Sequence, residues 1–321
     1  MTSVEIALLE LLRKIHAKAF GVTVKPKPAR IVDVEEASLK IRTLLENDLP
    51  VMIARFGGNE LNAVVNFLGV KAGPSSRLDY IRGKSLPWWW KPGALNQMVQ
   101  NAGFFPAQES ALEKFGVLML RDIPEIDLLG SWLPEELMFA NELANAPKVD
   151  LELLNPYFSS VPWTRALEGK KVLVIHPFAR LIETQYQRRE LLFKNNLLPA
   201  FDLKTIRAVQ SIAGERTEFA DWFAALESMK SAMDQTDYDI CLIGCGAYGF
   251  PLAAHAKRCG KKGVHIGGSL QLLFGIRGKR WEDPNYNPYY NFSVLMNEHW
   301  VRPGKEETPR AADKVEGACY W

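Results

Sequence analysis

The sequence predicts an α/β fold of the Rossmann-like type, in which helices cover both faces of a mostly parallel sheet. Continuous apolar runs at 171–176 and 239–244 are typical of strands that are buried on both faces. Helical patterns alternate with these and other strand-like runs along the chain, which is the order found in parallel α/β sheets. Glycine turns follow several of the predicted strands, as expected where ligands bind.

Residues 1–30 are predicted to form an amphipathic helix and an arm. Apolar residues recur on one face of 3–20, with Ser3 as N-cap; they are Val4, Leu8, Leu11, Leu12, Ile15 and Ala19. This face can pack on the core, on a second copy of the chain or on a membrane surface. The stretch from Lys25 to Pro28 then breaks the helix.

The first α/β unit begins after this arm. A helix is expected from Asp33 to about Asn47, then a strand at 50–55 and a helix that opens near Asn59. A loop-rich region at 71–105 follows and contains Trp88, Trp89 and Trp90. Beyond it we expect helices near 107–121 and 134–145, with a short buried strand at 127–132 between them.

The second half repeats the alternation more clearly. Strands are expected at 171–176, 202–212, 239–244 and 263–266, and helices at 179–194, 218–233 and 251–258. We therefore expect one α/β domain at 31–281 and an aromatic-rich tail at 282–321.

Composition excludes several classes. The 321 residues carry 39 basic and 37 acidic side chains, a net charge of +2, which argues against a nucleic-acid coat. The four cysteines fit no paired C-x-x-C zinc template, and five scattered histidines argue against a His-rich metal site. Charged residues interrupt the N-terminal apolar pattern, and no apolar run reaches the length of a membrane span, so a cytoplasmic location is expected.

The first glycine turn joins the 50–55 strand to the next helix. Its pair Gly57-Gly58 lets backbone N–H groups approach a ligand, and the helix N-terminus attracts anions. Glu60 either complements the helix dipole or binds a ribose hydroxyl or a cation. Arg55 either binds a phosphate or pairs with a carboxylate. Both alternatives are open from the sequence.

The second glycine turn, Gly244 to Gly249, fits G-x-G-x-x-G between a strand and a helix. The acidic residue of a dinucleotide site is missing, because 256–281 contains no Asp or Glu. This disfavours a dinucleotide site and leaves a mononucleotide or sugar-nucleotide site open. The same stretch is basic and surrounds the Gly267-Gly268-Ser269 turn; it carries Lys257, Arg258, Lys261, Lys262, Arg277, Lys279 and Arg280. It forms either a solvated face or a site for an anion such as a diphosphate.

Two further side chains are candidates. His176 ends a strand and is either an acid, base or hydroxyl ligand or a core residue. Trp132, with Asp127 and Glu135 nearby, either stacks on a sugar or packs in the core. Sequence motifs of P-loop phosphotransferases, α/β-hydrolases and H-E-x-x-H metalloproteases are absent.

Three segments resemble GT-D-type glycosyltransferases. They are VMIARFGGNELNAV at 51–64, KKVLVIHPFARLIETQYQRRELLF at 170–193 and YDICLIGCGAYGFPLAAHAKRCGKKGVHIGGSLQLLFG at 238–275. In that family a strand ends in R-[FY]-G-D-G-E before a helix. By position, the family's Arg matches Arg55, its first Gly matches Gly57 and its Glu matches Glu60. Gly58 stands where the family has Asp, and Asn59 stands at its second Gly.

The resemblance implies a Rossmann-like enzyme that moves a sugar from a UDP- or GDP-linked donor to a glycan or other acceptor in polysaccharide or glycoconjugate biosynthesis. In the family the D-x-E motif binds a divalent cation, Mn²⁺ or Mg²⁺, and the donor diphosphate. With Gly58 in the Asp position, either Glu60 holds a cation with Asn59, or Arg277 and Lys279 neutralise the diphosphate, or transfer activity is lost.

The expected site has three parts. Glu60 and His176 are the candidate catalytic groups, and Trp89 and Trp132 the candidate acceptor platforms. The donor is expected at Arg55, Gly57, Gly58, Asn59, Gly244, Gly246, Tyr248, Gly268, Ser269, Arg277 and Lys279. Two other functions stay open: another nucleotide-dependent enzyme, such as a methyltransferase that uses the Gly244 turn, and a non-catalytic partner in glycan assembly.

Overall fold

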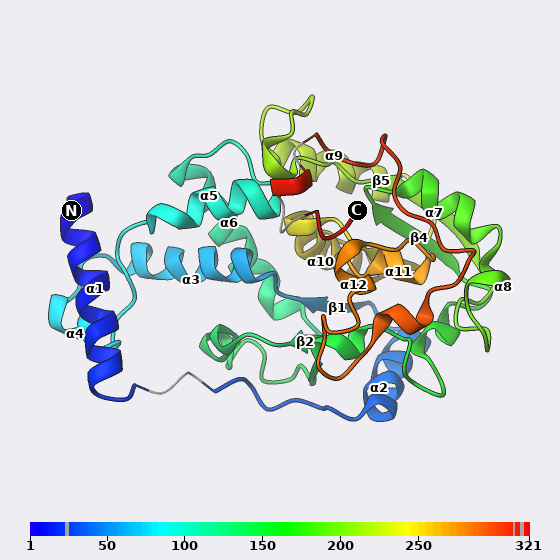
Figure 1. Ribbon diagram of the computed structural model, residues 1–321, viewed down its shortest axis with the longest axis horizontal. Coiled ribbons are helices and arrows are strands. Elements are labelled where there is room, and N and C mark those ends of the chain that lie inside the picture. Colours follow the sequence, from blue (N-terminus) through cyan, green and yellow to red (C-terminus); the bar gives the residue numbers. More distant parts are fainter. Residues whose placement is uncertain (23–25, 311, 315–317) are drawn as a thin grey trace.

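A computed structural model of the protein describes residues 1–22, 26–310, 312–314 and 318–321 (Figure 1). Lys25 of the expected arm therefore lies outside the described residues. Within these ranges the strands form a seven-stranded sheet in the order β3-β2-β1-β7-β6-β4-β5. The strands are β1 (Val51–Arg55), β2 (Leu128–Ser131), β3 (Lys148–Asp150), β4 (Lys171–His176), β5 (Asp202–Arg207), β6 (Ile240–Ile243) and β7 (Lys262–His265).

Each of the six strand pairings is parallel. Ile53 of β1 lies opposite Leu128 of β2 on one side and Val264 of β7 on the other. The predicted α/β fold with a parallel sheet is confirmed. Strand β5 ends at Arg207 and is therefore shorter than the expected strand at 202–212. Strand β3 was not expected, because it is a short edge strand in which only Val149 is fully buried.

Helices cover both faces, as the alternation of β1 shows. Met52 and Ala54 face one apolar cluster with residues of α3, α5, α6, α9 and α10, whereas Val51 and Ile53 face another with residues of α2, α7, α8 and α11. The helices are α1 (Ser3–Ala19), α2 (Val34–Glu46), α3 (Gly58–Ala72), α4 (Arg77–Ile81), α5 (Pro92–Ala102), α6 (Glu109–Asp122), α7 (Ala179–Tyr186), α8 (Arg189–Leu192), α9 (Trp222–Asp234), α10 (Gly249–Arg258), α11 (Leu270–Leu273) and α12 (Lys279–Glu282).

Three helix predictions need correction. The region at 71–105, expected to be loop-rich, contains α4 and the three-turn helix α5. The expected α-helix at 134–145 is a short 3₁₀ segment, Pro134–Phe139, followed by turns. The carboxylate of Glu136 turns inward there and accepts hydrogen bonds from the Ser131–Leu133 loop, which fixes the chain in a tighter path. The expected helix at 179–194 is divided into α7 and α8.

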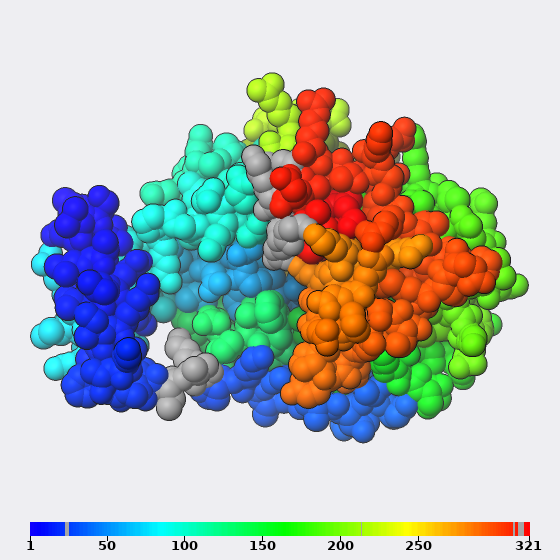
Figure 2. Space-filling view, viewed as in Figure 1, coloured from blue at the N-terminus to red at the C-terminus, as the bar shows by residue number. Residues whose placement is uncertain are grey.

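Helix α1 lies at one end of the molecule, beside α4 (Figures 1 and 2). Its N-cap is Thr2 instead of Ser3, because Thr2 and Glu5 form a capping box. Leu9 is its one fully buried residue and packs with Tyr80 and Trp89. The predicted apolar stripe is mostly exposed, with Val4 at 76% and Ile15 at 54%. None of the helices in the described part of the chain is long and apolar enough to cross a bilayer.

The segment after α12 packs back on the α2–α7 face of the sheet. Phe292 and Trp300 are buried there, and Ile276 pairs with Val301 in a short parallel bridge. The orange and red surface of Figure 2 shows this segment spread over the face of the molecule that carries α11 and α12. The last described residues, 318–321, reach the carboxyl edge of the sheet, where Gly268 contacts Tyr320.

Replacing Gly263 by alanine is expected to lower the free energy of unfolding by about 1–3 kcal/mol, the usual range for an overpacked core. A Cβ on this β7 residue would lie 2.6 Å from the carbonyl oxygen and 2.8 Å from the Cα of Ala253 in α10, and backbone atoms cannot rotate away. Urea unfolding measures the loss. Gly93→Ala is the control, since a Cβ there meets no atom within 4 Å; equal stability of the two variants would contradict this account.

Candidate functional site

The candidate site lies at the carboxyl edge of β1, where the chain passes from strand to helix. Arg55 ends β1, Gly57 is the N-cap of α3, and Glu60 lies in the first turn of that helix. In a parallel sheet all strands end at this edge, so the residues after β1, β2 and β7 meet there. The structure brings together Arg55, Gly57, Gly58, Glu60 and Trp132 from the predicted set.

The carboxylate of Glu60 folds back against the backbone of Gly57. A Cβ on Gly57 would lie 1.9 Å from Oε2 and 2.3 Å from Cδ of Glu60, so only glycine leaves this place open. Gly57 has an ordinary extended backbone with φ −76°, and its lack of a side chain therefore serves this close approach. Burial raises the pKa of Glu60, and the neighbouring Arg55 partly offsets the rise.

Arg55 lies between Gly267 and Trp132. If Gly267 carried a Cβ, that atom would lie 3.3 Å from Nη1 of Arg55. On the other side, Cζ of Arg55 is 5.8 Å from the centroid of the Trp132 ring. Nε of Arg55 is buried without a hydrogen-bond partner, and no ion pair between described residues includes this guanidinium. A buried donor without a partner is costly, so a bound anion would satisfy Arg55.

Trp132 is held in a fixed position. Its indole Nε1 donates to the carbonyl of Phe56 at 3.0 Å, and its ring edge lies 3.4 Å from a Cβ placed on Gly58. The buried Glu136 accepts from the Trp132 backbone N–H at 2.9 Å and from the Ser131 hydroxyl at 2.5 Å. The sequence suggested Glu135 and Asp127 as its carboxylate neighbours; the structure gives this role to Glu136.

The turn after β7 forms the next wall. Gly267 has φ +85°, and Gly268 faces Tyr320, because a Cβ on Gly268 would lie 2.2 Å from that ring. Ser269 is half-buried just before α11. The centroid of the Tyr320 ring also lies 5.1 Å from Cζ of the Arg280 guanidinium. Sequence reasoning missed Tyr320, because nothing in a polar tail indicates that it returns to the sheet edge.

Arg277 and Lys279 flank this turn from the side of the tail. The Arg277 guanidinium donates to the carbonyl of Trp300 at 3.1 Å, and the backbone N–H of Lys279 donates to the carbonyl of Trp321.

Glu152 was missed by sequence reasoning. Burial, reinforced by Asp150, raises the pKa of Glu152, while a hydrogen bond from the Asn287 side chain and the charges of Arg55 and Arg280 act to lower it.

The second glycine turn is filled by the protein itself. A Cβ on Gly244 would lie 2.7 Å from the carbonyl oxygen of Gly267 and 2.8 Å from the His176 ring, and one on Gly249 would lie 2.2 Å from the His265 ring. Gly246 takes φ +58°. Tyr248 is buried and stacks on Trp222 at 4.8 Å. Gly244 and Gly249 thus permit close packing of β6, β7 and α10, whereas Gly246 is exposed and a Cβ there would meet only the carbonyl oxygen of Ala102, at 3.6 Å.

His176 is fully enclosed at the end of β4. Its Nδ1 accepts a hydrogen bond from the Phe178 N–H at 3.1 Å, and burial lowers its pKa to about 3. His265, at the end of β7, is buried too, and burial and Arg55 lower its pKa to about 3. Both rings are therefore neutral at pH 7.

Of the two alternatives for the basic stretch, an anion site at the carboxyl edge does not hold for its first half. Lys257 donates to Asp127 at 2.9 Å, Arg258 pairs with Asp122 at 2.9 Å, and Lys262 donates to the carbonyl of Leu49 at 2.6 Å. These partners precede β2 and β1, at the amino edge of the sheet. The reason is geometric, because α10 carries the chain from one edge back to the other.

Trp89 lies away from the site. It packs against Tyr80 and Leu9 under α1, and its carbonyl accepts a hydrogen bond from the Asn66 side chain, about two turns along α3 from Glu60.

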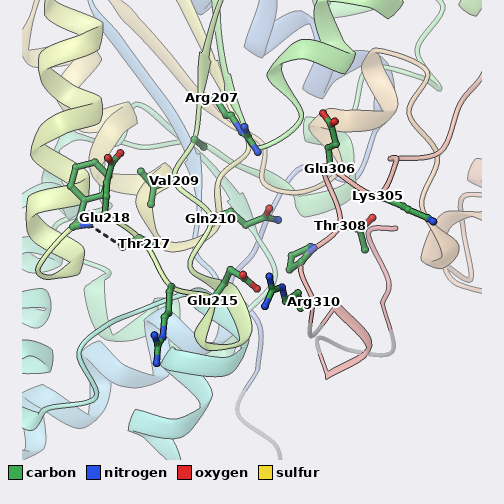
Figure 3. Close-up of a pocket in the computed structure, with 14 residues that line it drawn as sticks. Arg207, Val209, Gln210, Glu215, Thr217, Glu218, Lys305, Glu306, Thr308 and Arg310 are labelled. Atoms are coloured by element: carbon green, nitrogen blue, oxygen red, sulfur yellow. Dashed lines mark hydrogen bonds between the residues drawn. The ribbon is translucent and has the colours of Figure 1, made fainter.

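A cavity of about 540 Å³ opens at the carboxyl end of β5, between the 207–219 loop and residues 305–310. Figure 3 shows Gln210, Glu215 and Arg310 on its two walls. None of the predicted site residues lines this cavity.

The residues at Glu60 do not fit a divalent cation. Mn²⁺ and Mg²⁺ prefer several oxygen ligands with at least one or two free carboxylates. Glu60 has a guanidinium beside it, and among the described residues no His, Cys, Asp or Glu side chains gather with it into a group of three ligands.

Comparison of the chain with protein-family models, with curated proteins and with solved structures finds no match.

Proposed function

We propose that the protein is a glycosyltransferase that uses a nucleoside-diphosphate sugar and works at the carboxyl edge of β1. The observation that supports this proposal most is the Arg55–Glu60 arrangement: a buried guanidinium nitrogen without a partner beside a carboxylate folded onto Gly57. A diphosphate is the kind of anion that an arginine fork binds. The helix N-terminus of α3 adds a second favourable field for negative charge.

In this mechanism each side chain has one task. Arg55 stabilises the negative charge that develops on the leaving diphosphate, which a metal would otherwise do. Glu60 accepts the proton of the acceptor hydroxyl, and its raised pKa makes it a better base than an ordinary carboxylate. Trp132 offers a fixed aromatic face for a sugar ring. His176 has no task in the transfer, because it is enclosed and packs against Gly244.

Thermal unfolding in the presence of ligands tests this function. UDP or GDP, and their sugar conjugates, are expected to raise the Tm by a few degrees at about 100 times their Kd, where binding adds roughly 2.7 kcal/mol of stability. The shift should persist in EDTA. A shift with S-adenosylmethionine alone would replace this proposal by a methyltransferase, and no shift with any nucleotide would favour a non-catalytic partner in glycan assembly.

Filling the space at Gly57 gives a sharper test. Gly57→Ala is expected to displace the Glu60 carboxylate, and because misplacement by about 1 Å costs on the order of 100-fold, turnover should fall by about that factor. Gly93→Ala is the control, since a Cβ there meets no atom within 4 Å and this residue of α5 lies outside the site. Transfer assays on both variants should separate them; equal activity would remove Glu60 from the mechanism.

A further inference from the structure

A second group of functional side chains lies at the amino edge of the sheet, far along the fold from Glu60. Asp234 is the last residue of α9, and His255 and Cys259 lie one turn apart at the end of α10. The i, i+4 spacing places the imidazole and the thiol on one face of α10, which packs against α9. Asp234 and Cys259 are exposed and His255 is half-buried, so solvent reaches the group.

The distances between the three ligand atoms are close to those around a tetrahedral metal ion. Cys259 Sγ lies 3.6 Å from His255 Nε2 and 3.6 Å from Asp234 Oδ1. With Zn–S bonds of about 2.3 Å and Zn–N and Zn–O bonds of about 2.0–2.2 Å, a tetrahedral site has ligand edges of roughly 3.4–3.6 Å. The third edge, His255 Nε2 to Asp234 Oδ1, is 2.8 Å, so a small rotation of the exposed Asp234 side chain completes the triangle.

We propose that Asp234, His255 and Cys259 form a binding site for a transition-metal ion of the Zn²⁺ type, with water in the fourth position. Nitrogen, oxygen and thiolate ligands together select zinc or cobalt over magnesium or calcium. Binding displaces the thiol proton to solvent, and the two negative ligands then balance the charge of the ion. Among the described residues this is the one group of three such side chains within reach of a shared ion.

The surroundings support this assignment. Arg258, the cation next to Cys259 in the chain, directs its Nη1 to Asp122 at 2.9 Å. The site joins the ends of α9 and α10, and a bound ion would therefore fasten these two helices together. It shares no residue with the carboxyl-edge site.

Cobalt absorption spectroscopy on the full chain, free of any histidine tag, tests the site. We expect one Co²⁺ per chain, a thiolate-to-cobalt charge-transfer band and the d–d bands of tetrahedral cobalt, all removed by added Zn²⁺. Because loss of an outer-shell partner alone weakens metal binding by about 10–100-fold, Cys259→Ser and His255→Asn should each weaken Zn²⁺ binding by more than about 100-fold, as measured by competition with a chromophoric chelator.

His299→Asn is the matched control, since this half-buried histidine lies in the C-terminal segment, and Glu60→Ala should also bind Zn²⁺ like the natural chain. Circular dichroism reports whether each variant is folded. A natural chain without the thiolate band, or with affinity unchanged in Cys259→Ser and His255→Asn, would overturn the site and leave a plain hydrogen-bonded group. Neither result bears on the proposed transfer activity.

Discussion

Replacing Glu60 by glutamine or alanine is expected to lower the rate of sugar transfer by about 10²–10⁴-fold, the usual contribution of a general base. The amide of glutamine has nearly the same shape as the carboxylate but cannot accept a proton. The fold should remain intact, because Glu60 lies at the half-buried first turn of α3 and its pKa is already raised by burial, so removing the charge costs the folded state little. Single-turnover assays with saturating donor measure the chemical step directly.

Glu109→Gln is the control for this result. Glu109 is also a first-turn carboxylate, at the start of α6, so it shares the dipole interaction with Glu60 but lies outside the site. Its loss should leave the transfer rate unchanged. If Glu60→Gln kept full activity while Arg55→Ala abolished it, the edge would be a donor site with its base elsewhere.

Acid is expected to destabilise the protein through its two enclosed histidines. His176 and His265 have a pKa of about 3 in the folded chain, against 6.5 in an unfolded one. Between pH 6.5 and pH 3 the unfolded chain binds more protons than the folded chain. The free energy of unfolding therefore decreases as the pH falls below about 6.5, and it keeps decreasing until about pH 3. At pH 5 each histidine accounts for about 2 kcal/mol. Glu60 and Glu152, with a raised pKa, act in the opposite direction and reduce the total.

Urea unfolding at pH 7.5 and pH 5 measures this loss. The difference between the two pH values should be smaller by about 2 kcal/mol in His176→Gln than in the natural chain, even if the variant is less stable at both. His299→Gln should show the full difference, since its ring is partly exposed. Identical pH dependence in all three proteins would mean that His176 is protonated in the folded state.

Local sequence patterns were sufficient for the central strands of the sheet and for most of its long helices. The continuous apolar runs of β4 and β6 predicted strands buried on both faces, and the structure covers them on both faces. The step from β1 through Gly57 to α3 was predicted as well, because strand, glycine and helix signals follow one another without a gap. These signals arise between neighbouring residues, and in these segments no distant contact overrides them.

Patterns failed where the outcome depended on distant residues. The Pro134–Phe139 segment has helical periodicity, yet Glu136 turns inward to bind the Ser131–Leu133 loop. The Gly244 turn has the spacing of a phosphate loop, yet His176 and His265 from other strands occupy its space. His255 and Cys259 fit no zinc template by themselves, because the third ligand, Asp234, belongs to another helix.

The sequence by itself determined the parallel α/β architecture, the carboxyl edge at which β1 meets α3 and the candidacy of Arg55 and Glu60, since each follows from order along one stretch of chain. Only the tertiary structure decided which basic residues reach that edge, that the tail brings Tyr320 onto Gly268, and that Gly57 makes room for Glu60. The physical reason is that packing and pairing act through space, between side chains whose separation in sequence carries no signal.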